Sequence, residues 1–176
     1  MKTNRSLLCV ALCALVCSFA VLGFAADKHD ASAWAIQVEP VQAEEGQLPP
    51  DFSMAIYEDL LTRLAKSNNF QRVYRSGDHE AKNIPNLLIL RMTLLNFEHG
   101  NQTERAVTTV KGSTKVQVRL KVAPRDGAPL VEKDVQGTVR FFGENLKATD
   151  ALAKRIAKTL REAPLPAPGT AKAAGQ

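Results

Sequence analysis

The sequence predicts an α+β domain in which a mixed, largely antiparallel sheet of about five strands carries two helices on one face. Two observations predict it. Apolar residues recur at helical spacing in residues 51–67 and 145–162, and five other segments are alternating or continuous apolar runs. In chain order the elements read β-α-β-β-β-β-α. The apolar stripes of both helices and one face of the sheet would then share a single core.

The first part of the 176-residue chain is typical of an export signal. Lys2 and Arg5 precede an apolar run over 7–26, and polar residues follow at once. Small side chains at Gly23 and Ala25 predict cleavage after Ala25, which makes 1–25 a signal peptide and 26–32 a mobile leader. The run is also long enough to cross a bilayer, so an uncleaved anchor over 7–26 is the alternative.

The three cysteines, Cys9, Cys13 and Cys17, all lie inside this export segment. The bulky residues Leu12 and Val16 directly precede Cys13 and Cys17, which disfavours lipidation of either one. Cleavage would leave a cysteine-free chain that must be stabilised by an ordinary core. It would also leave 21 basic and 18 acidic residues, a net charge of +3 instead of +5, which is too mild to indicate nucleic-acid binding.

A strand, a helix and a second strand are predicted at the start of the exported part. Apolar residues alternate from Trp34 towards Pro40, which indicates the first strand. Asp51 or Ser53 could cap a helix that ends at 67–69, and the residues at 70–74 read as a short strand. This order predicts a βαβ crossover. The stripe of the helix consists of Ile56, Leu60 and Leu64.

The continuous apolar run at 87–95 predicts a central strand covered on both faces over its first half. The alternating segment 114–122 predicts the next strand, and a turn at 125–128 leads to a fifth strand from Leu130 to about Phe141. The register of this hairpin pairs Val122 with Val131, Val118 with Val135, Lys121 with Glu132, and Arg119 with Asp134, and it places Lys133 out of pattern opposite Leu120.

A second helix is predicted after Gly143, capped by Asn145 or Thr149 and ending at Glu162. Its stripe consists of Leu152, Ile156 and Leu160. Residues 163–176 are rich in Pro and Ala and are predicted to be a disordered tail. The folded domain is therefore expected to span 33–162.

No combination of residues indicates catalysis. His29, His79 and His99 are too dispersed for a local metal motif, and Asp78-His79-Glu80 is more simply solvated charge in a polar loop. Ser76 and Ser113 lack the context of a catalytic serine. The basic face formed by Lys115, Arg119 and Lys121 should be partly neutralised by Glu132 and Asp134. We therefore predict no catalytic, cofactor-binding or metal-binding residue and no nucleic-acid partner.

The order of the elements resembles the small exported domains of the DUF4410 type. These are similar in outline to the amino-terminal domain of TolB and to the curli-secretion and penicillin-binding-protein-activator lipoproteins. The resemblance covers about 33–162 and departs from the family at the missing lipobox cysteine and at Asn86, where Asp is usual. It implies no catalytic residues. The matching residues are Ala55, Leu60, Leu64, Phe70-Gln71-Arg72-Val73, Asn86 to Met92, Gly112, the strand 116–122, Asp126-Gly127 and the helix 145–162.

These observations predict a non-catalytic protein of the bacterial periplasm or envelope that acts through contact with an unidentified envelope protein. The alternative is a module that binds a small ligand or peptidoglycan through the loops at 40–50 and 75–86. Membrane association is expected only if the apolar segment is retained or lipidated.

Overall fold

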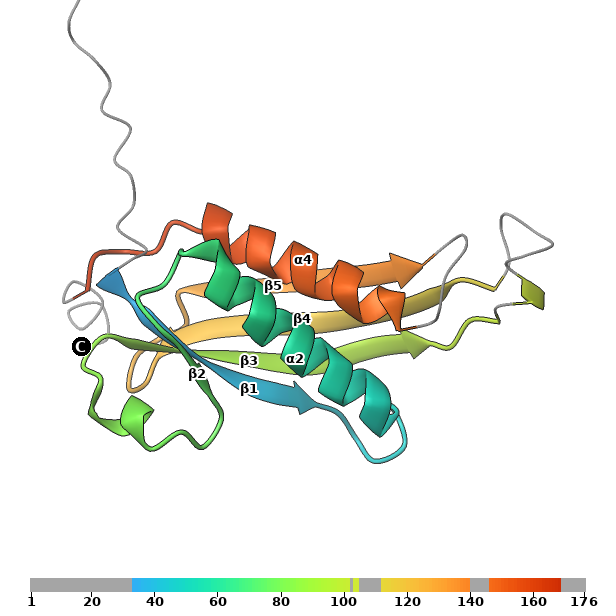
Figure 1. The fold of residues 1–176 in the computed structure, drawn as a ribbon, viewed down its shortest axis with the longest axis horizontal. Coiled ribbons are helices and arrows are strands. Elements are labelled where there is room, and N and C mark those ends of the chain that lie inside the picture. Colours follow the sequence, from blue (N-terminus) through green and yellow to red (C-terminus); the bar gives the residue numbers. More distant parts are fainter. Residues whose placement is uncertain (1–32, 102, 105–111, 140–145, 169–176) are drawn as a thin grey trace, which may run out of the picture.

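A computed structural model describes residues 33–101, 103–104, 112–139 and 146–168 of the chain. Figure 1 shows a single five-stranded sheet with two long helices lying side by side on one of its faces. The elements are β1 (Ala35–Gln42), α2 (Pro50–Ser67), β2 (Val73–Arg75), the 3-10 helix η3 (Glu80–Asn83), β3 (Leu87–Glu98), β4 (Thr114–Pro124), β5 (Val131–Val139) and α4 (Lys147–Glu162). The predicted fold class and order of elements are confirmed.

The sheet has the strand order β2-β1-β3-β4-β5. β1 pairs in parallel with β2 and β3, whereas β3 with β4 and β4 with β5 are antiparallel. The predicted βαβ unit is formed by β1, α2 and β2. Because β1 is parallel to both of its neighbours, half of the strand pairs in this mixed sheet are parallel.

The core lies between the sheet and the two helices. Both predicted helix stripes point into it and are almost fully buried, as is the apolar face of β4. Burial on this scale supplies most of the stability of such a fold, at about 25 cal/mol per Å² of apolar surface. The buried residues that carry this packing are Ile56, Leu60, Leu64, Val116, Val118, Leu120, Val122, Leu152, Ile156 and Leu160.

The hairpin register is confirmed in full. Val118 lies opposite Val135, and Arg119 lies opposite Asp134. Lys133 lies opposite Leu120 on the side of the sheet that faces the helices, and its side chain is exposed because β5 is the edge strand. β3 runs further than predicted, to Glu98, after an irregularity between Leu94 and Asn96.

The predicted helix caps are wrong where the structure describes them. α2 starts at Pro50, with Pro49 in the cap position, so Asp51 and Ser53 lie inside its first turn. Proline presets the backbone for a first helical turn and has no N–H of its own that a cap would have to satisfy. α4 starts at Lys147 and places Thr149 inside the helix, whereas Asn145 lies outside the described residues. The predicted end of α2 is correct, because Asn68 adopts the left-handed conformation there.

The segment after α4 also differs from the prediction. Leu165 is only 5% exposed and belongs to the core, and the indole Nε1–H of Trp34 donates to the carbonyl of Pro166 at 2.7 Å. A disordered tail from 163 onwards is therefore wrong for 163–168. Composition alone does not predict this, because a proline-rich stretch can pack when one of its apolar side chains is buried in the core and one of its carbonyls accepts a hydrogen bond. Residues 169–176 and the whole of 1–32 lie outside the described residues.

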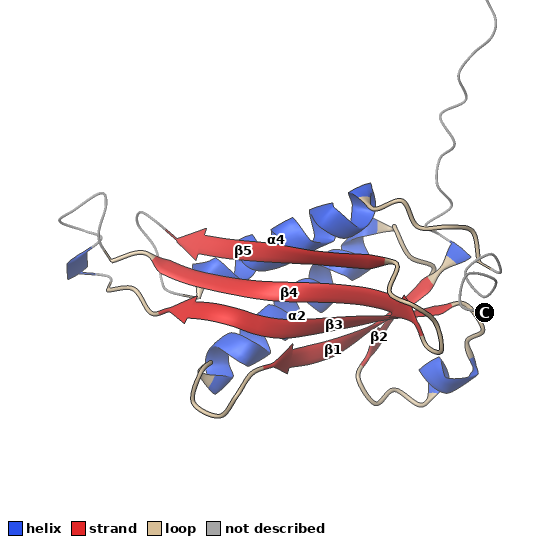
Figure 2. Ribbon diagram, turned by 180° about the vertical axis from the view of Figure 1, so that it is seen from behind, coloured by secondary structure: helices blue, strands red, loops and turns tan. Residues whose placement is uncertain are grey.

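A second, smaller apolar cluster lies on the face of the sheet opposite the helices. Ala81 and Ile84, in and just after η3, pack there against Ala35, Tyr74 and Leu87. Arg125 of the β4–β5 turn donates to the carbonyls of Ala81 and Lys82, which fixes η3 to the hairpin. η3 therefore covers one end of this face. Figure 2 shows the rest of it without a covering helix.

Candidate functional site

The sheet face that turns away from the helices carries rows of charged side chains beside the small apolar cluster under η3; we call it the open face. Strand alternation brings Glu39, Arg91, Lys121 and Glu132 into one row across β1, β3, β4 and β5. The Nε of Arg91 lies 3.2 Å from Glu39, and Lys121 lies 3.8 Å from Glu132. The row therefore has two cations in the middle and an acid on each side.

The strongest contact of the open face joins Arg119 to Asp134 on the next strand. The guanidinium donates two hydrogen bonds to the carboxylate, at 2.8 and 3.1 Å. This hydrogen bonding lowers the pKa of Asp134 below its ordinary value and raises the pKa of Arg119. Both residues are exposed, so the pair helps to fix the register between β4 and β5 more than it adds to the stability of the fold.

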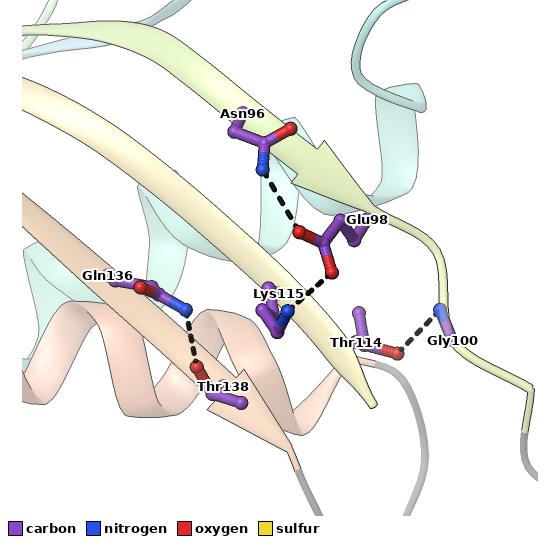
Figure 3. A network of polar contacts seen from close by, with 7 residues as sticks. All are labelled: Asn96, Glu98, Gly100, Thr114, Lys115, Gln136 and Thr138. Carbon is purple, nitrogen blue, oxygen red and sulfur yellow. Dashed lines mark hydrogen bonds and ion pairs between the residues drawn. The ribbon is translucent and has the colours of Figure 1, made fainter. Parts of the chain in front are cut away.

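A polar network lies at the end of the open face where β3 ends and β4 begins (Figure 3). Lys115 donates to Glu98 at 2.6 Å, and the amide of Asn96 donates to the same carboxylate at 3.2 Å. The hydrogen bond from Lys115 is the main cause of a lowered pKa at Glu98. All three predicted basic residues of β4 therefore have an acidic partner. Sequence reasoning missed the third pair because Glu98 comes from β3, whose register with β4 has no local signal.

The long edge of the sheet is partly protected against further strand addition. β5 is the edge strand, and Arg155 of α4 donates to the carbonyl of Gln136 at 2.9 Å. The exposed Lys133 adds a charge on the same strand. At the other edge β2 is only three residues long. Short edge strands, lysines and covered backbone groups are the usual means by which proteins avoid edge-to-edge pairing.

The loop Asp78-His79-Glu80 behaves as a structural turn. The carboxylate of Asp78 accepts the backbone N–H of Glu80 at 3.0 Å, and Glu80 pairs with Arg72 at 2.7 Å. Nowhere in the described residues do three His, Cys, Asp or Glu side chains gather as ligands for a metal ion. Ser76 donates its backbone N–H to the hydroxyl of Tyr57, which places it beside α2.

The two loops of the predicted ligand-binding alternative do not come together. The loop at 43–49 leaves the C-terminal end of β1, whereas the segment at 76–86 packs beside Ala35 and Leu87, at the N-terminal ends of β1 and β3. Figure 1 shows them at opposite ends of the sheet. A single site built from both loops is therefore not formed.

Among the described helices, none combines the length and the apolar character that a bilayer span requires. Residues 7–26, over which an anchor is the alternative prediction, lie outside the described part of the chain.

No protein-family model and no curated protein sequence matches the chain. Solved structures do match. The PelC dodecamer from Paraburkholderia phytofirmans has a TM-score of 0.54 and 12% identity over 74% of this chain and 89% of that one. A variant of the same dodecamer has a TM-score of 0.53 and 14% identity over 74% and 90%. The hypothetical protein CT253 from Chlamydia trachomatis has a TM-score of 0.50 and 10% identity over 72% and 92%.

At these identities the similarity shows a common fold. Coverage of about nine tenths of each of those chains means that the similarity extends over nearly their whole length. The resemblance to the DUF4410 type stays a prediction, since no family model matches.

Proposed function

We propose that the chain is an exported, non-catalytic protein of the bacterial envelope that acts through protein–protein contact, as a subunit of an assembly that includes further copies of itself. The observation that carries the proposal is the fold shared with PelC, whose crystal structures are of a dodecamer. The apolar segment at 7–26 supports export.

The structure supports contact through faces rather than through strand addition. Both sheet edges are unfavourable for strand addition, because of Arg155 and Lys133 at β5 and the shortness of β2. The open face, in contrast, has rows of charged residues that are paired with one another. Polar side chains that already have ionic partners are typical of the solvated rim of a protein–protein interface.

The mass of the particle in solution tests the proposal directly. The protein is expressed in a bacterium, purified from the envelope fraction, and measured by size-exclusion chromatography with light scattering and by native mass spectrometry over a wide concentration range. We expect a discrete oligomer whose mass is an integer multiple of the chain mass. Export is measured in the same material, since intact mass spectrometry locates the processed N-terminus.

A strictly monomeric protein that also forms no crosslinks to other envelope proteins in cells would contradict the proposal. The non-catalytic part has its own test, a broad hydrolase substrate screen with the same preparation. Turnover that survives further purification and is lost in a single-residue variant would show that the protein is an enzyme.

A further inference from the structure

The outer face of α4 carries a row of four cations, Lys147, Lys154, Lys158 and Arg161, which we call the basic stripe. Their spacing of seven, four and three residues places them on one side of the helix, opposite the buried residues. All four are exposed. At about 1.5 Å of rise per residue the stripe is about 21 Å long.

Most of the positive charge of the basic stripe has no acidic partner among the described residues. Lys158 approaches Glu162 at 3.8 Å, and within the described residues the structure gives no ion pair to the other three. The open face contrasts with it, because Arg91, Lys115, Arg119 and Lys121 all have acidic partners. α4 as a whole has five basic and two acidic side chains.

The composition of the stripe distinguishes between possible anionic partners. Interfaces between proteins are poor in Lys and depend on buried aromatic or Arg anchors. Three of the four cations here are Lys, and the apolar residues between them that are not fully buried are the small Ala151 and Ala157. A row of flexible ammonium groups with no large apolar side chain between them matches a surface whose negative charge is spread out, and anionic lipid headgroups form such a surface.

We propose that the basic stripe docks the protein, with α4 lying flat, on a membrane surface that contains anionic phospholipid. The position of the chain's entry into the domain supports this orientation. Trp34, next to the first described residue, is hydrogen-bonded to Pro166, five residues beyond the end of the stripe. In the uncleaved alternative, the apolar segment ending at 26 is joined there by a few residues that reach at most about 25 Å. The inference goes beyond the proposed function and does not rest on it.

Vesicle co-sedimentation tests the docking. The protein is purified from the bacterial cell with the N-terminus that cellular processing produces. Its binding to phosphatidylcholine vesicles is then compared with its binding to vesicles containing about 30% phosphatidylglycerol. We expect preferential binding to the anionic vesicles at low salt and loss of the preference at about 0.5 M salt. Replacing Lys154 and Lys158 by Gln should lower the ratio of the two partition coefficients about 25-fold, since each surface cation contributes about five-fold.

The matched control is the double replacement of Lys82 and Lys121 by Gln, which removes the same charge from the side of the sheet away from the helices. It should keep most of the preference. Equal loss in both double variants would overturn the proposal, because net charge and not the stripe would then explain the binding. Equal affinity of the wild-type protein for both kinds of vesicle, or binding to neither, would also overturn it. Crosslinking of the basic stripe to an acidic envelope protein, together with no binding to vesicles, would overturn it as well.

Discussion

At the scale of single residues, Gly137 permits the close approach of α4 to the sheet. A Cβ added there would lie 2.2 Å from the carbonyl oxygen of Ala148 and 2.6 Å from the Cβ of Leu152. Neither atom can move without shifting the first turns of α4. This glycine has no role in turn geometry and lies inside a strand, which is a position where glycine usually marks close backbone approach.

We therefore expect Gly137→Ala to destabilise the fold by about 1–3 kcal/mol through overpacking. Urea unfolding measures the effect. Thr138→Ala is the matched control, since Thr138 is the next residue, points to the open face and bonds only to the side chain of Gln136. Equal stability of Gly137→Ala and the wild-type protein would mean that α4 does not approach β5 as closely as described.

A second residue-scale feature is the buried hydroxyl of Thr149. Its proton can go to the carboxylate of Asp59 at 2.9 Å or to the carbonyl of Leu146 at 2.6 Å. The residue is almost fully buried between the two helices. It therefore joins the start of α4 to α2.

Replacing Thr149 by Val keeps the shape and removes the hydroxyl, which should cost about 1 kcal/mol because the half-buried carboxylate of Asp59 loses this donor, whereas the carbonyl of Leu146 keeps the backbone N–H of Thr149. A double-mutant cycle with Asp59→Ala, followed by urea unfolding, isolates the contact between the helices. Strictly additive effects of the two changes would show that Asp59 and Thr149 do not interact.

At the scale of elements, exposed ion pairs join neighbouring strands and join α2 to β2. Hydrogen bonds from Arg119, Lys115 and Arg75 lower the pKa values of Asp134, Glu98 and Glu58 below 3.8, 4.5 and 4.5 respectively. A carboxyl group whose pKa is lower in the folded state stabilises the fold above its unfolded pKa. That contribution is lost as the pH falls through the folded value.

We expect the free energy of unfolding to be constant above about pH 5.5 and to decrease on acidification below about pH 4.5. Urea unfolding at a series of pH values measures this slope. Arg119→Gln should flatten it, because the pKa of Asp134 then returns towards its ordinary value. Arg125→Gln is the control, since Arg125 donates to carbonyls and should leave the slope unchanged. Identical slopes in Arg119→Gln and the wild-type protein would show that the pair of Arg119 and Asp134 does not contribute to the pH dependence of stability.

At the scale of the whole molecule, the segment after α4 closes the core. Leu165 packs into the main cluster, and the carbonyl of Pro166 accepts the indole N–H of Trp34, so the two ends of the described chain meet. Replacing Leu165 by Ala should therefore cost about 2–4 kcal/mol, as a large-to-small change in a core does. A disordered tail from 163 onwards would predict no change.

Thermal and urea unfolding of Leu165→Ala distinguishes these outcomes. Pro164→Ala, an exposed neighbour, is the control and should stay close to the wild-type value. Trp34→Phe keeps most of the buried ring and removes only the hydrogen bond, so its smaller loss separates the polar part of the closure from the apolar part.

The periodic features were predictable because they are local. The stripe at Ile56, Leu60 and Leu64 and the alternation at 116–122 follow from helical and strand geometry, and each short period fixes which side chains face the core. The β4–β5 register was also predictable. A short turn and two complementary charge pairs define it within one stretch of sequence.

Features that depend on distant partners were not predictable. Glu98 reaches Lys115 only through the pairing of β3 with β4, and Leu165 is buried because it packs into the main core formed by residues far away in the chain. The four cations of α4 stand out as a candidate site for the same reason. The sequence places them on one helix face, but only the tertiary structure shows that the four basic residues of the open face have acidic partners, whereas among the four cations of α4 Lys158 has one.

The sequence by itself determined the order of the elements and the faces that they bury, because each depends on residues close together in the chain. The tertiary structure decided the order β2-β1-β3-β4-β5, the parallel pairing of β1 with β3 and the inclusion of Leu165 in the core. These depend on which apolar surfaces meet, and that is settled by the best common packing of distant segments rather than by any local pattern.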